Sequence, residues 1–262
     1  MTDPIRDSDY DQTVTFRRDL EGWGRITKHV NLWYYNTKFG TFLLPIPNIR
    51  VLEPNIRFFA ANNIKGIFMQ GAYNALGANL PDLRNYMTSR LLWDPNQSGQ
   101  GLMEEFLDLH YGKAAPPIRR YINALHDSTE AKGIQEAWWG RAKDYGIDES
   151  VVQAGLAAFA QAMQLAENDV VRDRVEKLSI CAHMAALEEA LTWVWYVPGS
   201  YPHAGKGPPV PPDVARRTRP HFRKFFELCK KHGVTKWGQR ETIDHMNGFF
   251  KGNFGLKADE PW

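Results

Sequence analysis

The sequence is poor in the features that most directly assign a function. Among its 262 residues are only two cysteines, Cys181 and Cys229, which excludes a disulfide framework and a paired-cysteine zinc site. A single disulfide between them stays open, but we expect each to be a small core residue on an apolar helix face. The 32 lysines and arginines nearly balance 30 aspartates and glutamates, which argues against a nucleic-acid-binding protein with a basic face.

Long apolar runs are also missing. No stretch of about 18 apolar residues occurs, so we expect no membrane-spanning helix and no membrane partner. Residues 1–11 are polar and acidic and lack the apolar core of a secretory signal. The chain as it stands would remain in the cytoplasm, unless its targeting segment belongs to a longer parent protein, so the localisation is left open.

Motifs for metals, cofactors and nucleophiles are absent as well. The eight histidines show no HxH or HExxH spacing, so we expect no metal site. Glu241 and His245, four residues apart, are interpreted as a surface pair. No phosphate-binding loop or GxSxG turn occurs, and we expect no cofactor. Ser200 and His203 lie in a stretch rich in proline and glycine, where nothing would fix their geometry.

Charged and aromatic residues are grouped in a few places. A basic run (Arg216, Arg217, Arg219, Arg223 and Lys224) lies in a helical pattern and is interpreted as a solvated helix face. Aromatic residues make up 13% of the chain, including nine tryptophans. They indicate either a large helical core or a surface that stacks against sugar rings, and composition favours the core. We assign Trp138–Trp139 and the group at 193–196 to the core in the same way.

The order of elements predicts an α/β part followed by a mostly helical part. Residues 1–22 read as a polar tail. Residues 30–35 and 64–70 read as strands buried on both sides, and 49–62 as the helix between them, which is typical of a parallel β/α arrangement. Helices are predicted at 81–92, 100–110, 116–126, 134–143, 151–167, 170–196, 214–232 and 241–250. We therefore expect a tail at 1–22, an α/β segment at 23–96 and a helical domain at 97–262.

Five consecutive pieces carry a resemblance to a known family. They are VNLWYYNTKF at 30–39, LLPIPNI at 43–49, NIRFFAANNIKGIFMQGAY at 55–73, DLRNYMTSRLLWDP at 82–95 and EEFLDLHYGKAAPPIRRYI at 104–122. Together they resemble a bacterial family of domains of unknown function, number 4838, which is associated with α-glucuronidase-like barrel glycosidases. The resemblance implies that the two strands are the last ones of a (β/α)8-type barrel.

The resemblance also implies a place for a carbohydrate site, because such barrels bind substrate at the C-terminal ends of their strands. Those ends are Tyr34, Tyr35 and Asn36 in the first strand, and Gln70 and Tyr73 at the second. Amide and phenol groups pair with sugar hydroxyls, and aromatic faces stack on sugar rings. An equally strong alternative is that these residues pack or cap. Tyr34 and Tyr35 alternate along the strand, so one should face the barrel interior and the other the helices. Trp33 should pack against helices.

The strand ends lack the two carboxyl groups that glycoside hydrolysis requires. The resemblance implies acidic residues where this chain has Tyr34 and Met69. The nearest acids, Glu53 and Asp82, fall in predicted helices. A full barrel also needs about 250 residues, far more than the strand region offers.

Three hypotheses follow. The chain is the C-terminal portion of a glycoside-hydrolase-like protein that acts on polysaccharide as part of a larger unit, a non-catalytic carbohydrate-binding module, or a helical interaction protein. A partner chain supplies the remaining strands, or the sequence is a gene fragment, or it is a non-catalytic remnant. Whether it is an enzyme is left open. The open edges of an incomplete sheet predict self-association.

Overall fold

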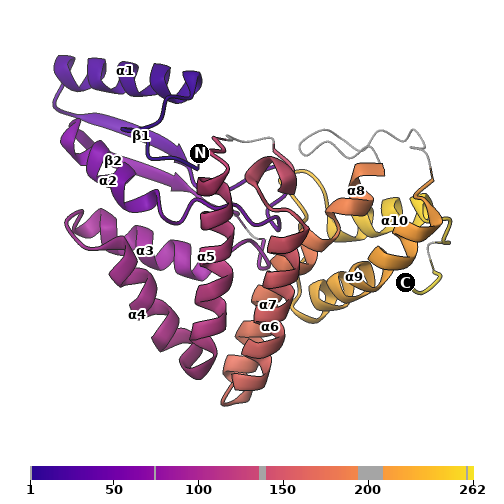
Figure 1. Cartoon of the computed structure of the whole chain (residues 1–262). Coiled ribbons are helices and arrows are strands. Elements are labelled where there is room, and N and C mark those ends of the chain that lie inside the picture. The colour runs from indigo at the N-terminus through magenta and orange to yellow at the C-terminus, as the bar shows by residue number, and fades with distance from the viewer. Residues whose placement is uncertain (1, 74, 136–139, 194–208, 258) are drawn as a thin grey trace.

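The computed structural model describes residues 2–73, 75–135, 140–193, 209–257 and 259–262. Two strands and a series of helices follow one another from the sheet end of the molecule to the C-terminal helices (Figure 1). In chain order they are α1 (Asp11–Ile26), β1 (Val30–Tyr35), α2 (Leu52–Ala61), β2 (Ile64–Gln70), α3 (Pro81–Trp93), α4 (Gly99–Tyr111), η1 (Gly112–Ala114), α5 (Ala115–Ala131), η2 (Ala142–Tyr145), α6 (Glu149–Leu165), α7 (Asp169–Ala186), α8 (Glu188–Trp193), α9 (Pro212–Lys231) and α10 (Ile243–Asn253). The predicted α/β part followed by a helical part is confirmed.

Strands β1 and β2 pair in parallel, as the sequence predicts. The register places Tyr34 opposite Met69, and both side chains lie on the face that α2 covers with Phe58 and Phe59. The prediction that both strand faces are buried was wrong. Odd-numbered residues of β1 point to the opposite face, where exposed side chains such as Trp33 show that no described element packs over the sheet.

The predicted polar tail contains a helix. Helix α1 occupies most of this segment, and Leu20 on its inner side is buried. The residues before it are held by specific bonds: the Ile5 amide donates to Asn55 Oδ1 at 2.8 Å, and Arg17 donates to the Ile5 carbonyl at 3.1 Å. Its few apolar side chains were too sparse to signal a helix, yet Ile5 and Leu20 both join the core beside Tyr34.

Most predicted helices are present, and side-chain caps mark where several begin. Ser98, Asp148, Asn168 and Thr242 each accept a hydrogen bond from a backbone amide three residues on, which satisfies a free N–H group at the helix start. The predicted helix at 170–196 is instead α7 and α8, separated at Leu187. Among the described residues of the predicted helix at 134–143, the helical ones are 142 and 143, which belong to the short η2. Residues 136–139 and 194–208, with their tryptophans and Ser200–His203, lie outside the described residues, as does the Trp193 side chain.

The main hydrophobic core runs through the helices and reaches back to the loop that follows β1. It includes Leu43 and Leu44 of this loop as well as Trp237 near the C-terminus, so it extends across residue 96. Three backbone hydrogen bonds fasten the loop: the Phe42 amide donates to the Trp237 carbonyl, Asn79 to Phe42, and Gln239 to Phe39, at 2.9, 3.1 and 2.8 Å. The C-terminal segment therefore covers the loop at the end of β1.

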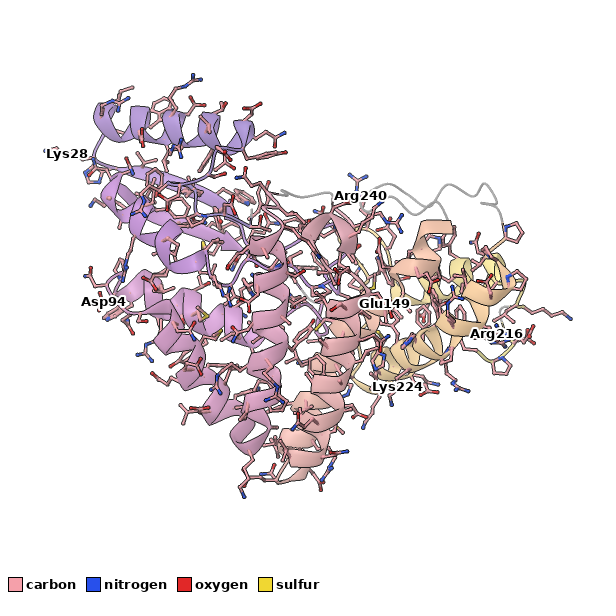
Figure 2. All side chains as sticks on the ribbon, viewed as in Figure 1. Lys28, Asp94, Glu149, Arg216, Lys224 and Arg240 are labelled. Atoms are coloured by element: carbon pink, nitrogen blue, oxygen red, sulfur yellow. The ribbon has the colours of Figure 1, made fainter. Side chains whose placement is uncertain are left out.

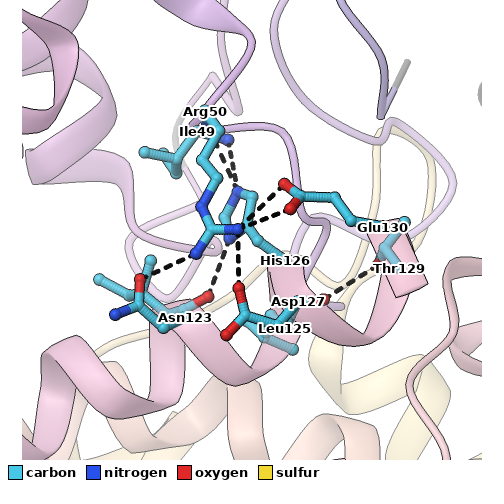
Figure 3. Close-up of polar contacts among 9 residues, drawn as sticks. Ile49, Arg50, Asn123, Leu125, His126, Asp127, Thr129 and Glu130 are labelled. Carbon is cyan, nitrogen blue, oxygen red and sulfur yellow. Dashed lines mark hydrogen bonds and ion pairs between the residues drawn. The ribbon is translucent and has the colours of Figure 1, made fainter.

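A polar junction joins the start of α2 to α5 (Figure 3). His126 is 2% exposed, and its Nε2 accepts from the Ile49 amide at 3.1 Å while Nδ1 donates to the Ile122 carbonyl at 2.8 Å. Beside it, Arg50 pairs with Asp127 and Glu130 at 2.8 and 2.9 Å. Burial lowers the pKa of His126 to about 4, so its ring is neutral and can accept and donate at once.

The predictions for the basic run and the cysteines are met in the described residues. The prediction that Glu241 and His245 form a surface pair was wrong, because Glu241 precedes α10 and is 5% exposed, while His245 is exposed on that helix. All members of the basic run are exposed on α9, and Figure 2 shows Arg216 and Lys224 at its outer surface. Cys181 and Cys229 are buried, free thiols within the helical core. Among the described helices, none combines the length and apolar character needed to cross a membrane.

Candidate functional site

The uncovered face of the two-stranded sheet carries three exposed aromatic side chains. Trp33 is 62% exposed, Phe68 54% and Tyr35 40%. Trp33 lies opposite Phe68 in the strand register, and their ring centroids are 4.9 Å apart in an edge-to-face arrangement. We call this surface, formed by Trp33, Tyr35, Phe68 and Gln70, the open sheet face. The prediction that Trp33 packs against helices was wrong. Side chains alternate along a strand, so Trp33 lies on the same exposed face of the sheet as Tyr35.

Polar contacts orient the aromatic rings on the open sheet face. The Trp33 indole nitrogen donates to Gln70 Oε1 at 2.6 Å, which fixes the ring across both strands. The Tyr35 ring packs edge-on against Phe39 with a centroid separation of 5.3 Å. The amide nitrogen of the Gln70 side chain is a second polar group on the open sheet face, and it can donate to a hydroxyl group of a ligand.

A cavity of about 310 Å³ adjoins the open sheet face between α1 and β1. Its wall combines aromatic rings with a few polar groups, which is typical of small-molecule sites. The lining residues are Asp3, Ile5, Tyr10, Gln12, Thr13, Phe16, Trp33, Tyr34, Tyr35 and Asn55. Trp33 and Tyr35 belong to both the cavity wall and the open sheet face, so the two form one continuous candidate site.

Asp3 is the one carboxyl group among the cavity-lining residues that the structure describes. Burial raises the pKa of this carboxyl, and the nearby Asp9 adds to the effect, while a hydrogen bond from Gln135 opposes it. Hydrolysis of a glycosidic bond requires a second carboxyl about 5–9.5 Å away. Within the described wall, the chemistry available is stacking and hydrogen bonding.

Two of the predicted sugar-contacting residues lie in the interior. Tyr34 is 6% exposed, and its hydroxyl accepts from Asn55 Nδ2 at 3.1 Å. Burial raises the pKa of Tyr34 to about 12, so the phenol is neutral. Asn36 is 3% exposed, and its backbone amide donates to the Gln70 carbonyl at 2.9 Å, which extends the strand pairing by one step. Both residues support the sheet from within, and Tyr34 also forms part of the cavity wall.

The other three predicted residues lie where a ligand can reach them. Tyr35 and Gln70 face each other in the register on the open sheet face. Tyr73 lies on the loop after β2, where it is 89% exposed and has a φ of 54°. It is not among the residues that line the cavity. The structure thus brings Tyr35 and Gln70 together with Trp33, and separates Tyr73 from them.

The acids considered for catalysis have structural roles. Glu53 accepts from the Gly99 amide at 2.5 Å and pairs with Arg57 at 2.5 Å, so it joins α2 to the start of α4. Asp82 lies in the first turn of α3, where a negative charge offsets the helix dipole.

The sequence interpretation missed the residues that α1 contributes. Tyr10, Thr13 and Phe16 are spaced by three, as expected for one side of a helix, but the charged segment around them read as a tail. Phe68 was missed because its strand was expected to be buried on both sides. Among the described residues, one group could hold a metal ion: Asp173, Glu176 and His232, between α7 and α9.

Comparison with known proteins covers the part of the chain that contains this site. Residues 1–123 match the model of a family described as a domain of unknown function, DUF4838. The match supports the family resemblance for the sheet, α1 and all of the cavity-lining residues. A search of curated proteins found no match. A search of solved structures also found none.

Proposed function

We propose that this chain binds carbohydrate through the open sheet face and the adjoining cavity, and that it is the C-terminal portion of a glycoside-hydrolase-like protein. The observation that carries the proposal is the exposure of Trp33, Tyr35 and Phe68 on one sheet face beside Gln70. Clustered exposed aromatic side chains cost free energy in water and mark interaction sites. Sugar rings suit such a surface because their C–H faces stack on aromatic rings, while their hydroxyls pair with amides.

The position of the open sheet face also supports the barrel part of the proposal. In a (β/α)8 barrel the helices lie outside the strands, and the opposite strand face lines the interior. Here α2 connects β1 to β2 and covers one face only. The open sheet face is therefore the one that would line a barrel, and a two-stranded sheet is a fragment of that arrangement.

Binding without hydrolysis is the activity expected of this chain alone. Asp3 is the single acid among the described lining residues, and a second carboxyl would have to come from the missing barrel strands. A partner chain carrying those strands would supply both the remaining sheet and the catalytic pair.

Replacing Trp33 with alanine tests the binding proposal. We expect a glycan that binds the wild type to bind Trp33→Ala about tenfold more weakly. The substitution removes both the indole ring that stacks on the sugar and the hydrogen bond that orients Gln70. A glycan array followed by titration of the best ligand, monitored by tryptophan fluorescence, measures the change.

Trp93→Ala is the matched control, because Trp93 is 90% exposed at the end of α3 and is not part of the site. It should bind as the wild type does. Equal weakening by both substitutions, or a wild type that binds no glycan, would remove the proposal.

Association with another chain is a second candidate function, favoured by the two unpaired strand edges. Within the described residues the sheet consists of β1 and β2, so each strand has an outer edge that no described strand pairs with, next to exposed aromatic side chains. We expect light scattering to show concentration-dependent association of the purified wild type. Phe68→Glu should reduce it by placing a charge on the open sheet face. A wild type that stays monomeric at all concentrations contradicts this candidate.

A further inference from the structure

A histidine and two carboxylates converge where α7 packs against the end of α9. Asp173 and Glu176 are three residues apart on α7 and therefore share a face of that helix. His232 follows the last residue of α9. Its Nδ1 lies 3.7 Å from Asp173 Oδ1, and its Nε2 lies 3.4 Å from Glu176 Oε2. One ligand atom from each residue falls within 4.8 Å of the others.

The His232 ring is buried without a hydrogen-bond partner at Nε2. Its side chain is 5% exposed, and Nε2 is a buried atom for which the described residues offer no hydrogen bond. The contact with Glu176 lacks the geometry of a hydrogen bond. Leaving a buried polar atom unpaired costs about 1–3 kcal/mol. A ligand at this nitrogen would remove that cost.

The electrostatic surroundings favour a cation. Lys231 forms an ion pair with Glu176, so this carboxylate is already used to hold a positive charge. The C-terminal end of α9, with its partial negative charge, is at the same place.

The group is also open to solvent on one side. The Asp173 side chain is 64% exposed, and Asp173 lines a cavity of about 260 Å³ between α3, α4 and α7. An incoming ion would therefore reach Asp173, the one proposed ligand that lines this cavity, from solvent. Water from this side would complete its coordination.

We propose that Asp173, Glu176 and His232 form a binding site for a divalent transition-metal ion of the zinc class. Imidazole and carboxylate are ligands that zinc accepts, with bonds of about 2.0–2.2 Å and ligand atoms about 3.4 Å apart in a tetrahedral site. With His232 Nε2 as the ligand, its separation of 3.4 Å from Glu176 Oε2 is close to that spacing, and one ligand atom of each of the three residues lies within 4.8 Å of the others. The ion replaces the Lys231 ammonium at Glu176, and Lys231 moves into solvent, where 57% of its side chain already lies.

Calorimetric titration with Zn²⁺, after removal of metals by a chelator, tests the site. The wild type should bind one equivalent. Removing a residue that hydrogen-bonds to a metal ligand typically weakens metal binding about 10–100-fold, and removing a ligand itself should weaken it at least as much. His232→Gln should therefore lower the affinity for Zn²⁺ by about 10–100-fold or more. Lys231→Met should bind more tightly than the wild type, because the competing ammonium is gone.

His245→Gln is the control, since His245 is exposed, acts electrostatically on the carboxylate of Glu241 and lies outside the group. It should leave the titration unchanged. Asp173→Asn decides the question if His232→Gln fails to fold, because it alters an exposed carboxylate only. Absence of Zn²⁺ binding by the wild type, or equal binding by wild type and Asp173→Asn, overturns the proposal.

Discussion

Replacing Trp237 with alanine should lower the free energy of unfolding by about 3–5 kcal/mol, the largest effect expected of any single change discussed for this chain. The Trp237 side chain has no exposed surface, and its ring packs against Phe225 and Phe250 at centroid separations of 5.6 and 5.4 Å. The surrounding helices close such a space only in part, so a cavity would remain. Urea denaturation of wild type and variant measures the loss.

Trp93→Ala provides the contrast, because the same substitution at a side chain that is 90% exposed should change stability by about 0.5 kcal/mol or less. Trp237→Phe should fall between the two, since it keeps an aromatic ring in the space. A loss below about 1 kcal/mol in Trp237→Ala would show that the C-terminal segment does not contribute to the main core.

The second large effect is a loss of stability in mild acid caused by His126. An imidazole in the unfolded chain binds a proton near pH 6.5, whereas burial lowers the pKa of His126 in the folded protein to about 4. Between these values the unfolded state binds more protons, so stability falls as the pH is lowered. The loss reaches about 3 kcal/mol near pH 4, and above pH 6.5 this group has no effect.

His183 acts in the same direction, because burial lowers its pKa to about 4 as well. Urea denaturation at a series of pH values from 7.5 to 4 measures the combined slope (about 1.4 kcal/mol per pH unit for each histidine). His126→Gln keeps an acceptor for the Ile49 amide but does not titrate, so its slope should be shallower than that of the wild type. Identical slopes would mean that His126 is already protonated, or accessible to water, in the folded protein.

Elements with a strong local pattern could be predicted from the sequence. The β-branched and aromatic run at 30–35 and the apolar run at 64–70 are strands, and they pair in parallel. Helix α1 was missed because Leu20 is its single buried residue, which leaves almost no apolar periodicity to detect. The cavity wall receives Tyr10 from the position just before this helix and Phe16 from the helix itself, and tertiary packing alone makes these two residues significant.

The candidate site was predictable only where strand alternation determined it. Tyr34 and Tyr35 point to opposite faces, as expected, but the sequence could not tell which face is covered. Asn36 was expected at an open strand end and lies instead at the start of a buried loop, whose residues Phe39 and Phe42 are bonded by a C-terminal segment about 200 positions away in the chain. Asp173 and His232 lie on different helical elements, and no spacing rule joins them.

The backbone hydrogen bonds between the loop after β1 and residues 237–239 limit when this loop can fold during synthesis. During synthesis the sheet emerges first, yet the Phe42 amide cannot donate to the Trp237 carbonyl until the ribosome has added nearly the whole chain. A chain that ends at residue 123, where the family match stops, would leave Leu43 and Leu44 without the part of the main core that the later helices form. The residues that match the family therefore depend on later residues for part of their packing.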